Sequence, residues 1–446
     1  MSPTSYVCVG ISAHADARRG FHQERFLTIV AGVKSLSAGC EEPAESTEGG
    51  SPIENTFSAG TPSLLRAINE RSALETIRLR GPVSRAEIAR ETGLSKPTVS
   101  LALTGLARAN LVREVGRSRG GKGPSAALYE INPEAGWVAG IDVGRHFVRA
   151  AIADITGTVV ARASQRAQVR SANTLLSQIG GLAHELAADA GLEWGQITQA
   201  TVGSPGVLDP ARDSVALAAN LPGWGRQGMM EALRQELGAG VSFENDVNLA
   251  ALGERARGHG RDAATFVYLW IGTGVGMGVV LDGELYRGTH GAAGEIAYLP
   301  LGPGDPRDRT NRRRGAFEEA AAAAGIVRTA RALGMHPPLT PKKIFAAARR
   351  GDAGAARAVE SAAAQLALGI AAIAPILDPE LVILGGGIGR SGDLLLEPID
   401  RELREISPFR PRIVVSALGE DAVVHGAVAT ALEAARDRLY TRTQPA

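Results

Sequence analysis

Residues 84–112 read "SRAEIARETGLSKPTVSLALTGLARANLV", and this stretch carries the start signals of two successive helices. Ser84 and Glu87 have the S-x-x-E spacing of a capping box, which begins a helix by satisfying its first free amides. Gly93 supplies a permissive backbone for a tight turn, after which Ser95 can cap a second helix that has Pro97 in its first turn. The stretch therefore predicts a helix-turn-helix.

The second helix has two contrasting sides. Val99, Leu103 and Leu106 fall within one narrow stripe at helical spacing, so we expect them to face a core. The opposite side carries small hydroxyls, one apolar side chain and cations, which suit base edges and phosphates in a DNA major groove. This side is therefore a candidate for reading DNA.

A β-hairpin is expected after the second helix, because "LVREV" (111–115) and "AALYEIN" (126–132) can pair. Its tip, "GRSRGGKGPS" (116–125), is rich in glycine and basic, as in a wing that contacts DNA backbone or minor groove. The alternative is an ordinary helical bundle with a basic loop. The candidate DNA contacts are Ser95, Lys96, Pro97, Thr98, Ser100, Leu101, Thr104, Arg108, Arg117, Arg119 and Lys122.

The charge of the chain is uneven. Residues 1–60 contain 4 Lys/Arg and 7 Asp/Glu (−3), residues 61–130 contain 12 and 6 (+6), and residues 131–446 contain 32 and 34 (−2). The basic excess coincides with the helix-turn-helix, which indicates a module for a polyanion, although a solvated helix surface is the alternative.

Length and composition set further bounds. A chain of 446 residues suggests two to four domains, at about 100–200 residues each. Cys8 and Cys40 both lie near the N-terminus, which excludes a disulfide framework or cysteine-built metal site in the rest of the chain. The sequence has no run of about 18 apolar residues and no basic-then-apolar leader, so we expect a cytoplasmic protein without a membrane span.

Three segments follow from these patterns. Residues 1–60 are rich in Glu, Ser, Gly and Pro and are expected to be disordered or poorly ordered. Residues 61–133 form the DNA-binding domain, and residues 134–446 form the body. The domain is expected to open with a helix over 62–83, ended by "GP" at 81–82. The apolar side of this helix is expected to contain Leu64, Leu65, Ile68, Leu74, Ile77 and Leu79.

From Trp137 onward, short β runs alternate with Ala-rich helical runs, which predicts an α/β body with mixed sheets, arranged as two lobes with a cleft. Five of these runs contain acids, amides or glycines at the ends of strands. They are "AGIDVGRHFVRAAIADITGTVVA" (139–161), "VGSPGVLD" (202–209), "FENDVNLAALGE" (243–254), "WIGTGVGMGVVLDGELYRGTHGAAGEIAYLPLG" (270–302) and "LVILGGGIG" (381–389).

Together with the helix-turn-helix, these motifs resemble the ROK family of repressors, open reading frames and sugar kinases, over about residues 62–436. The regulator branch is the most similar. It places a winged helix-turn-helix before a two-lobed, actin-like (ribonuclease H-like) sugar-kinase body. That is the fold class that the resemblance implies.

The resemblance also implies a sugar site. In family kinases an Asn-Asp pair binds sugar hydroxyls and its Asp is the general base, and here the pair is Asn245 and Asp246. A helix N-cap is the alternative role for Asp246. Glu295, Glu318 and Asn220 match further family contacts to the sugar.

The phosphate motifs are only partly present. The family's D-x-G-G-T turn reads Asp142-Val143-Gly144-Arg145-His146 here, and an arginine adds bulk where backbone must approach phosphate. A second glycine motif, which contains Gly272, Thr273, Gly274 and Gly276, is intact; a plain structural turn is the alternative role for its glycines. We therefore expect Asp142, Gly144 and these four residues to be a vestigial phosphate site, and ATP not to be a cofactor.

The family's zinc ligands, a His and three Cys, are replaced by Tyr298, Arg309, Asn311 and Ala316. Tetrahedral zinc requires such nitrogen and thiolate donors, so we expect no zinc. Since the missing His also contacts sugar in the family, Tyr298 is a candidate to supply a hydroxyl in its place.

Three functions remain open. The first is a regulator that is expected to form dimers or tetramers, to bind an operator in double-stranded DNA and to respond to a sugar or sugar phosphate. Repression of carbohydrate genes, such as those for xylose, is the expected form. The second is an ATP-dependent sugar kinase with a DNA-binding head, in which Asp246 is catalytic. The third is a DNA-binding protein whose body only oligomerises.

Overall fold

The computed structural model describes residues 62–442 except 119–124, 210, 211, 213, 217–220, 239 and 303. The expected extension over 1–60 therefore lies outside the described residues, as do three candidate site residues, Asn220, Arg119 and Lys122. Residues 60–446 form one unit, within which the elements below are arranged.

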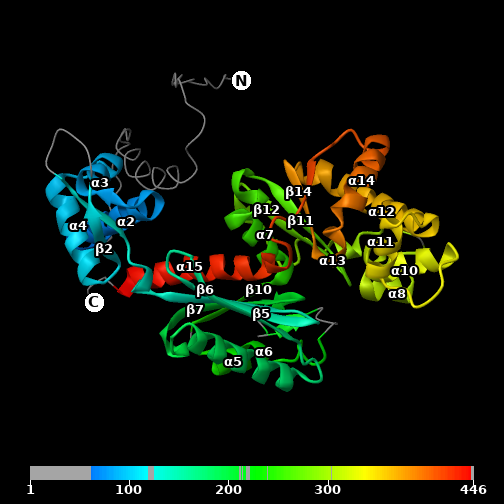
Figure 1. The fold of residues 1–446 in the computed structure, drawn as a ribbon, viewed down its shortest axis with the longest axis horizontal. Coiled ribbons are helices and arrows are strands. Elements are labelled where there is room, and N and C mark those ends of the chain that lie inside the picture. The colour runs from blue at the N-terminus through cyan, green and yellow to red at the C-terminus, as the bar shows by residue number, and fades with distance from the viewer. Residues whose placement is uncertain are drawn as a thin grey trace, which may run out of the picture. The chain divides into compact units, whose positions relative to one another are not determined.

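The N-terminal part of this unit, here called the head, contains three helices and a small sheet (Figure 1). Helices α3 and α4 and the hairpin β2–β3 confirm the predicted order of helix, turn, helix and hairpin. The sheet has the antiparallel order β1-β3-β2. Its elements are α2 (Pro62–Arg80), β1 (Val83–Ser84), α3 (Arg85–Thr92), α4 (Lys96–Arg108), β2 (Val112–Arg117) and β3 (Ala127–Ile131).

The local signals in the sequence operate as predicted. Ser84 and Glu87 form the reciprocal capping box at the start of α3, and Gly93 ends this helix at φ 70°, in the left-handed region. The Ser95 hydroxyl accepts a hydrogen bond from the Thr98 amide and caps α4. These three contacts fix the turn between α3 and α4 and hence the direction in which α4 leaves it.

The apolar side predicted for α2 is wrong in part. Leu74 and Ile77 are buried in the core of the head together with Ala73. Leu64, Leu65, Ile68 and Leu79 are exposed instead. At about 100° per residue Leu64, Ile68 and Leu79 lie on the side of the helix opposite Ala73 and Ile77, and Leu65 lies between the two sides, so α2 has two apolar sides rather than one. The helix also ends at Arg80, before Gly81, rather than at 83.

The body contains two five-stranded sheets of the same design. In each sheet three consecutive strands are antiparallel and two later strands add in parallel, in the orders β6-β5-β4-β7-β10 and β13-β12-β11-β14-β15. The strands of the first are β4 (Trp137–Val143), β5 (Phe147–Asp154), β6 (Val159–Arg166), β7 (Ile197–Ser204) and β10 (Val241–Asn245). Those of the second are β11 (Phe266–Ile271), β12 (Val275–Leu281), β13 (Glu284–Leu285), β14 (Leu381–Gly385) and β15 (Arg412–Val415). The repetition confirms the predicted two-lobed α/β body.

Helices cover both faces of each sheet. Helices α5 (Ala172–Asp189) and α6 (Met229–Leu237) pack on one face of the first sheet, and α12 (Ala353–Leu377) and α14 (Gly392–Ile406) pack on the second. The smaller elements are β8 (Val207–Asp209), β9 (Ser214–Ala216), α8 (Arg309–Arg314), α9 (Ala316–Ala321), α10 (Ala323–Ala332), α11 (Pro341–Arg349), α13 (Gly386–Gly389), and the 3-10 turns η1 (Pro133–Ala135), η2 (Trp194–Gln196), η3 (His259–Asp262), η4 (Ile296–Tyr298) and η5 (Gly419–Asp421).

Helix α12 is long and apolar enough to cross a membrane, judged by length and composition alone, and among the described residues no other helix is. Its side chains, such as Val359, Leu366 and Ile370, form part of the core of the second lobe. The apolar length of α12 is therefore explained by packing, because the core helix of a soluble protein has the same composition.

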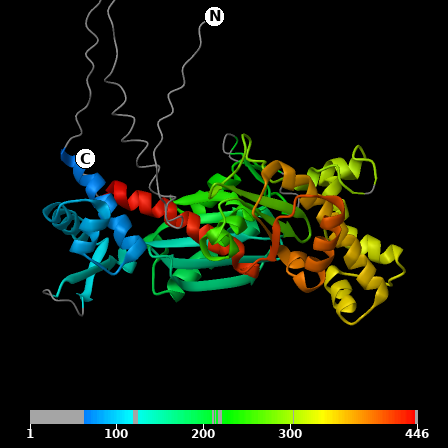
Figure 2. The same cartoon turned by 90° about the horizontal axis from the view of Figure 1, so that it is seen from above.

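Helices α7 (Asp246–Arg257) and α15 (Ala422–Arg442) join the two lobes. Apolar residues of α15 pack on the first sheet in one cluster and on the second sheet, with α7, in another. In both views α15, drawn in red, lies along the first sheet (Figures 1 and 2). The two helices approach closely at two glycines. A Cβ at Gly426 would overlap the Leu249 carbonyl oxygen, and a Cβ at Gly253 would overlap the Ala422 carbonyl oxygen.

Substitution of Gly426 by Ala should therefore destabilise the protein, because the new methyl group has backbone as its neighbour and forces the two helices apart. We expect the free energy of unfolding to fall by about 2 kcal/mol or more, measured by chemical denaturation. Gly181→Ala is the matched control, since it lies on the exposed side of α5 with nothing within 4 Å of the added Cβ. It should raise the free energy of unfolding by about 0.5–1 kcal/mol. Equal effects of the two substitutions would contradict the close contact.

Candidate ligand-binding site

A cleft of about 420 Å³ opens between the two lobes. Such a volume is within the usual range of small-molecule sites, about 300–1,000 Å³. The turn between β4 and β5, the start of α7 and the turn between β11 and β12 supply much of its lining. The candidate residues that line it are Asp142, Gly144, Asn245, Asp246, Thr273, Gly274, Gly276, Glu295 and Glu318.

The Asn-Asp pair lies where β10 ends and α7 begins. The Asn245 side chain is the N-cap of α7, because its Oδ1 accepts hydrogen bonds from the amides of Val247 and Asn248 at 2.9 and 3.1 Å. Its Nδ2 donates to the Gly206 carbonyl at 3.0 Å, which ties α7 to the loop after β7. Asp246 is the first helical residue, so the N-cap role that the sequence left open for it belongs to Asn245 instead.

The carboxyl groups at this end of the cleft hold their protons more tightly than usual. Burial raises the pKa of Asp246 to about 6. Burial also raises the pKa of Glu295, and the negative charges of Asp246 and Glu318 raise it further. A carboxyl with a raised pKa can accept hydrogen bonds from ligand hydroxyls and, when protonated, donate to them. We call Asp246, Glu295 and Glu318 the acidic end of the cleft.

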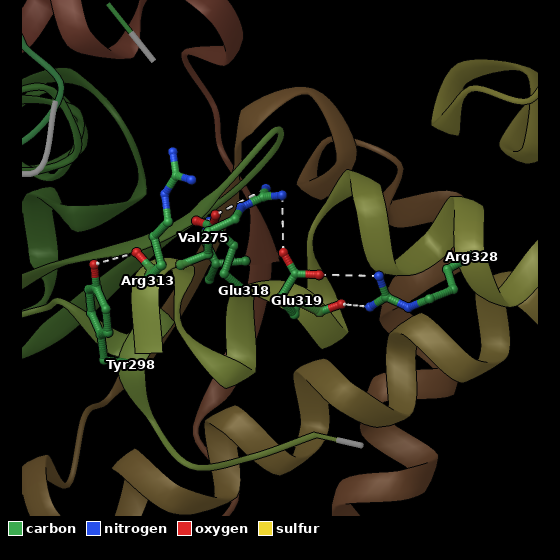
Figure 3. A network of polar contacts seen from close by, with 7 residues as sticks. Val275, Tyr298, Arg313, Glu318, Glu319 and Arg328 are labelled. Carbon is green, nitrogen blue, oxygen red and sulfur yellow. Dashed lines mark hydrogen bonds and ion pairs between the residues drawn. The ribbon is translucent and has the colours of Figure 1, made fainter. Parts of the chain in front are cut away.

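Glu318 is held by contacts from two directions. Its carboxylate accepts a hydrogen bond from the Val275 amide at 3.3 Å and pairs with Arg314 at 3.4 Å. Arg314 also pairs with Glu319 at 3.0 Å, and Glu319 pairs with Arg328 at 3.1 Å (Figure 3). This chain of charges fixes α8 and α9 against α10 and so positions Glu318 in the cleft.

The four positions where the resemblance would place zinc ligands lie beside this chain of charges. Tyr298 is exposed and is not part of the cleft lining, and its hydroxyl donates to the Arg313 carbonyl at 3.4 Å (Figure 3). Arg309 begins α8 and Ala316 begins α9. The Asn311 side-chain Nδ2 donates to the Asp305 carbonyl at 2.9 Å. Within the described part of the chain, no group of three or more His, Cys, Asp or Glu side chains is placed to hold a metal ion.

Two glycine-containing turns also line the cleft; the second, whose Val275 amide donates to Glu318, lies at the acidic end, and the first lies at the other end. In the first, the Gly144 amide bonds to the Phe147 carbonyl, which leaves Arg145 exposed at the tip of the turn and on the cleft lining. In the second, the Gly272 amide bonds to the Gly274 carbonyl, and Thr273 lines the cleft whereas Gly272 does not. Both turns therefore keep the hairpin geometry at the position that the motifs predict.

An ionic chain at the end of the cleft beside the first turn was not predicted from the sequence. Arg149, on β5, pairs with Asp142 at 3.3 Å and with Glu420 at 2.8 Å, and Glu420 pairs with Arg390 at 2.7 Å. Burial is the largest cause that raises the pKa of Asp142 to about 7, and Asp246 adds to it. Glu420 is 271 residues from Arg149 in the sequence, so no local spacing relates them. We call Arg145, Arg149 and Arg390, which all line the cleft, its basic end.

The fold agrees with comparisons to known proteins. Residues 138–434, which comprise most of the chain, match the sequence profile of the ROK family. The chain belongs to the ROK family. A ROK transcriptional regulator, described as a homolog of the E. coli MLC protein, has the same fold, with a TM-score of 0.69 and 22% identity over 85% of this chain and 98% of its own.

Two relatives differ in how much of the chain they match. The xylose repressor of Caldicellulosiruptor bescii is 27% identical over 83% of this chain and 96% of its own length. The glucokinase of Halalkalibacterium halodurans is 29% identical over 65% of this chain and 93% of its own. The match to the repressor covers 83% of 446 residues, or about 370. This exceeds the roughly 310 residues from Trp137 to the C-terminus. The match to the repressor therefore extends from the ROK body into the head, whereas the match to the glucokinase is no longer than the body.

The raised pKa of Asp246 predicts a pH dependence of stability. The folded protein binds this proton more tightly than the unfolded chain, whose Asp titrates near pH 3.8, so stability falls as pH rises from about 4 to about 6. Asp246→Asn lacks this titration. We expect the free energy of unfolding of the wild type minus that of Asp246→Asn to fall by at most about 3 kcal/mol between pH 4 and 7, since one pKa unit is worth about 1.4 kcal/mol.

Asp393→Asn is the control for this measurement. A hydrogen bond from Arg349 holds the pKa of Asp393 below its ordinary value, so its carboxyl does not titrate between pH 5 and 7. The difference between wild type and Asp393→Asn should be flat over that range. Chemical denaturation at each pH measures both differences. If the difference between wild type and Asp246→Asn did not change with pH, the pKa of Asp246 would not be raised.

Proposed function

We propose that this ROK protein is a sugar-responsive, DNA-binding transcriptional regulator that acts as a repressor. The observation that carries the proposal is the presence of a helix-turn-helix head joined to a ROK body, in a chain similar to xylose repressors over both parts. A kinase needs no such head. The head and the cleft supply, in one unit, a surface for DNA and a site for a small polar ligand.

The exposed side of α4 is the proposed DNA-reading surface. Val99, Leu103 and Leu106 are buried in the head, as predicted, which fixes the rotation of α4. Leu101 is 68% exposed, and Thr104 and Arg108 are exposed beside it. Lys96 is exposed at the first turn, where a cation can contact a DNA phosphate while the outward side chains contact base edges.

Lys96→Ala should weaken DNA binding on all sequences, because a phosphate contact carries no sequence information. The slope of log affinity against log salt should become less steep by about 0.9, the value for one phosphate contact. Arg357→Ala is the matched control, since it removes an exposed arginine on α12, in the body. Titrations of DNA flanking the coding region, at several salt concentrations, measure both slopes. An unchanged slope for Lys96→Ala would place the DNA elsewhere.

The acidic end of the cleft is the proposed site for sugar hydroxyls. Asp246, Glu295 and Glu318 converge there, and Asn245 holds the start of α7 in place. The names of the relatives favour a neutral sugar such as xylose as the ligand. A ligand that binds one arrangement of the lobes better than another shifts the population toward it, and this can change the fit of the head to DNA.

A sugar kinase is the second candidate, because glucokinases are among the relatives and Asp246 lies in the cleft. Two observations favour a regulator over an enzyme. Arg145 stands in the first phosphate turn, and the Asp142 carboxyl of that turn is occupied by Arg149. We propose further that the protein is a cytoplasmic homodimer or homotetramer that uses neither zinc nor ATP.

A thermal-shift screen of neutral sugars, including xylose and glucose, separates these functions. We expect a ligand to raise the midpoint of unfolding and to release DNA in a gel shift, because it binds the native state. Asp246→Asn should abolish both responses, whereas Glu397→Gln, on the exposed side of α14, should leave them unchanged. ATP consumption of a few turnovers per second, lost in Asp246→Asn, would identify an enzyme instead, since typical enzymes reach about ten per second.

A further inference from the structure

The chain crosses from the first lobe to the second at the acidic end of the cleft. Glu244 is on β10 and pairs in register with Gly203 of β7, inside the first sheet. Two residues later α7 begins with Asp246 and packs closely on the second sheet, where a Cβ at Gly278 of β12 would overlap the Val247 carbonyl oxygen. Contacts at this crossing therefore decide how the two lobes stand relative to each other beside Asp246.

The Glu244 carboxylate joins three segments at the crossing. One of its oxygens, Oε1, accepts hydrogen bonds from the Asn245 amide at 2.9 Å and from Nδ2 of Asn248 on α7 at 3.0 Å. The other, Oε2, accepts a hydrogen bond from Nε of Arg287 at 2.7 Å. Because Glu244 is buried, its negative charge depends on these three donors rather than on water.

Arg287 belongs to the second lobe. It follows β13, and its loop is fixed to β12 at both ends, since the Tyr286 amide donates to a β12 carbonyl at 2.8 Å and a β12 amide donates to the Gly294 carbonyl at 3.0 Å. Glu295, the next residue, lines the acidic end of the cleft. The ion pair between Glu244 and Arg287 thus connects the two lobes, and the loop that carries Arg287 also carries Glu295.

Burial distinguishes this ion pair from one at the other end of the cleft. At the basic end Arg149 pairs with Glu420, whose side chain is 54% exposed, and such pairs contribute little because water screens them. The Glu244 side chain is only 9% exposed, whereas Arg287 is half-exposed. Removal of the arginine would leave a buried carboxylate without its cation, which strongly destabilises the arrangement that buries it. Separation of the lobes would relieve that cost, because Glu244 then reaches water.

We propose that the ion pair between Glu244 and Arg287 is a latch between the lobes that positions Asp246 and Glu295 for a ligand. The proposal rests on the proposed function, since the ligand is the sugar proposed for the acidic end. Neither Glu244 nor Arg287 lines the cleft, so they are positioning residues that act through their neighbours. With the latch intact the two carboxyls converge, and with the latch broken fewer molecules have the arrangement that binds a sugar. The apparent Kd then rises by the factor by which that population falls.

The distance between the lobes tests the latch without any ligand. Spin labels at Ala188→Cys on α5 and Ala332→Cys on α10 report this distance, because these exposed positions lie on helices of the first and the second lobe. The two native cysteines, Cys8 and Cys40, are replaced by serine, and labelled protein is diluted with unlabelled protein so that only distances within one chain are measured. Pulsed double electron–electron resonance then gives the distribution of the distance.

Arg287→Met and Glu244→Gln should each lengthen and broaden the distance between the lobes. Methionine keeps the apolar stem of Arg287, and glutamine keeps the acceptor for Asn245 and Asn248, so each variant removes little beyond the ion pair. The double variant should show no further change, because both substitutions remove the same contact. Arg287→Lys should keep the wild-type distance, because it retains the positive charge and a single nitrogen of Arg287 makes the contact.

Glu284→Gln is the matched control for these variants. Glu284, on β13, pairs with Arg255 of α7 at 3.6 Å but is 64% exposed. Loss of this exposed ion pair should leave the distance between the lobes unchanged.

Isothermal titration with xylose and with glucose tests the positioning of the carboxyls. We expect the apparent Kd to rise about five-fold or more in Arg287→Met and Glu244→Gln, and to stay at the wild-type value in Glu284→Gln. A distance that is the same in wild type and in both latch variants overturns the latch, and lobes that separate without any change in affinity overturn the positioning. Lobes that separate in a protein that binds neither sugar nor DNA support the latch and refute the proposed function.

Discussion

The contact between α7 and α15 is the constraint on which the rest of the body depends. These helices approach closely at Gly253 and Gly426, where any side chain would meet the backbone of the other helix. Because α7 begins with Asp246 and α15 begins after Glu420, the same contact sets the distance between the two ends of the cleft. Packing of small residues between two sheets thereby determines where the charged side chains of the site stand.

The features that the sequence could predict are those set by short-range chemistry. The capping box at Ser84, the left-handed turn at Gly93 and the stripe through Leu103 each depend on neighbours within a few residues, and each is present. The helix α2 was predicted correctly, but its buried side was wrong in part, because a list of apolar residues does not fix the rotation of a helix. Only the position of the core shows that Ile77 faces inward and that Leu64 and Ile68 face outward.

The residues of the cleft were likewise predictable only where a motif in the sequence marks them. Asp246, Glu295 and Glu318 were predicted because they match residues that contact the sugar in the ROK family, and all three line the cleft. Asn220 lies outside the described residues, and Tyr298 lies beside the cleft rather than in its lining. The partners Arg149, Arg390 and Glu420 could not be predicted, since they come from two lobes and are joined only by the fold.

The two departures from the family's motifs have a common physical consequence. Beside the positions where the family's thiolates would bind zinc, Arg314, Glu319 and Arg328 form ion pairs that hold α8 and α9. Where a turn would bind the phosphates of a nucleotide, Arg149 and Glu420 form ion pairs that join the lobes. In both places the charged side chains make contacts within the chain. Ion pairs that are partly exposed contribute little to stability, so a ligand can exchange for them at small cost. A cleft closed in this way suits a protein that must respond to a ligand without reacting with it.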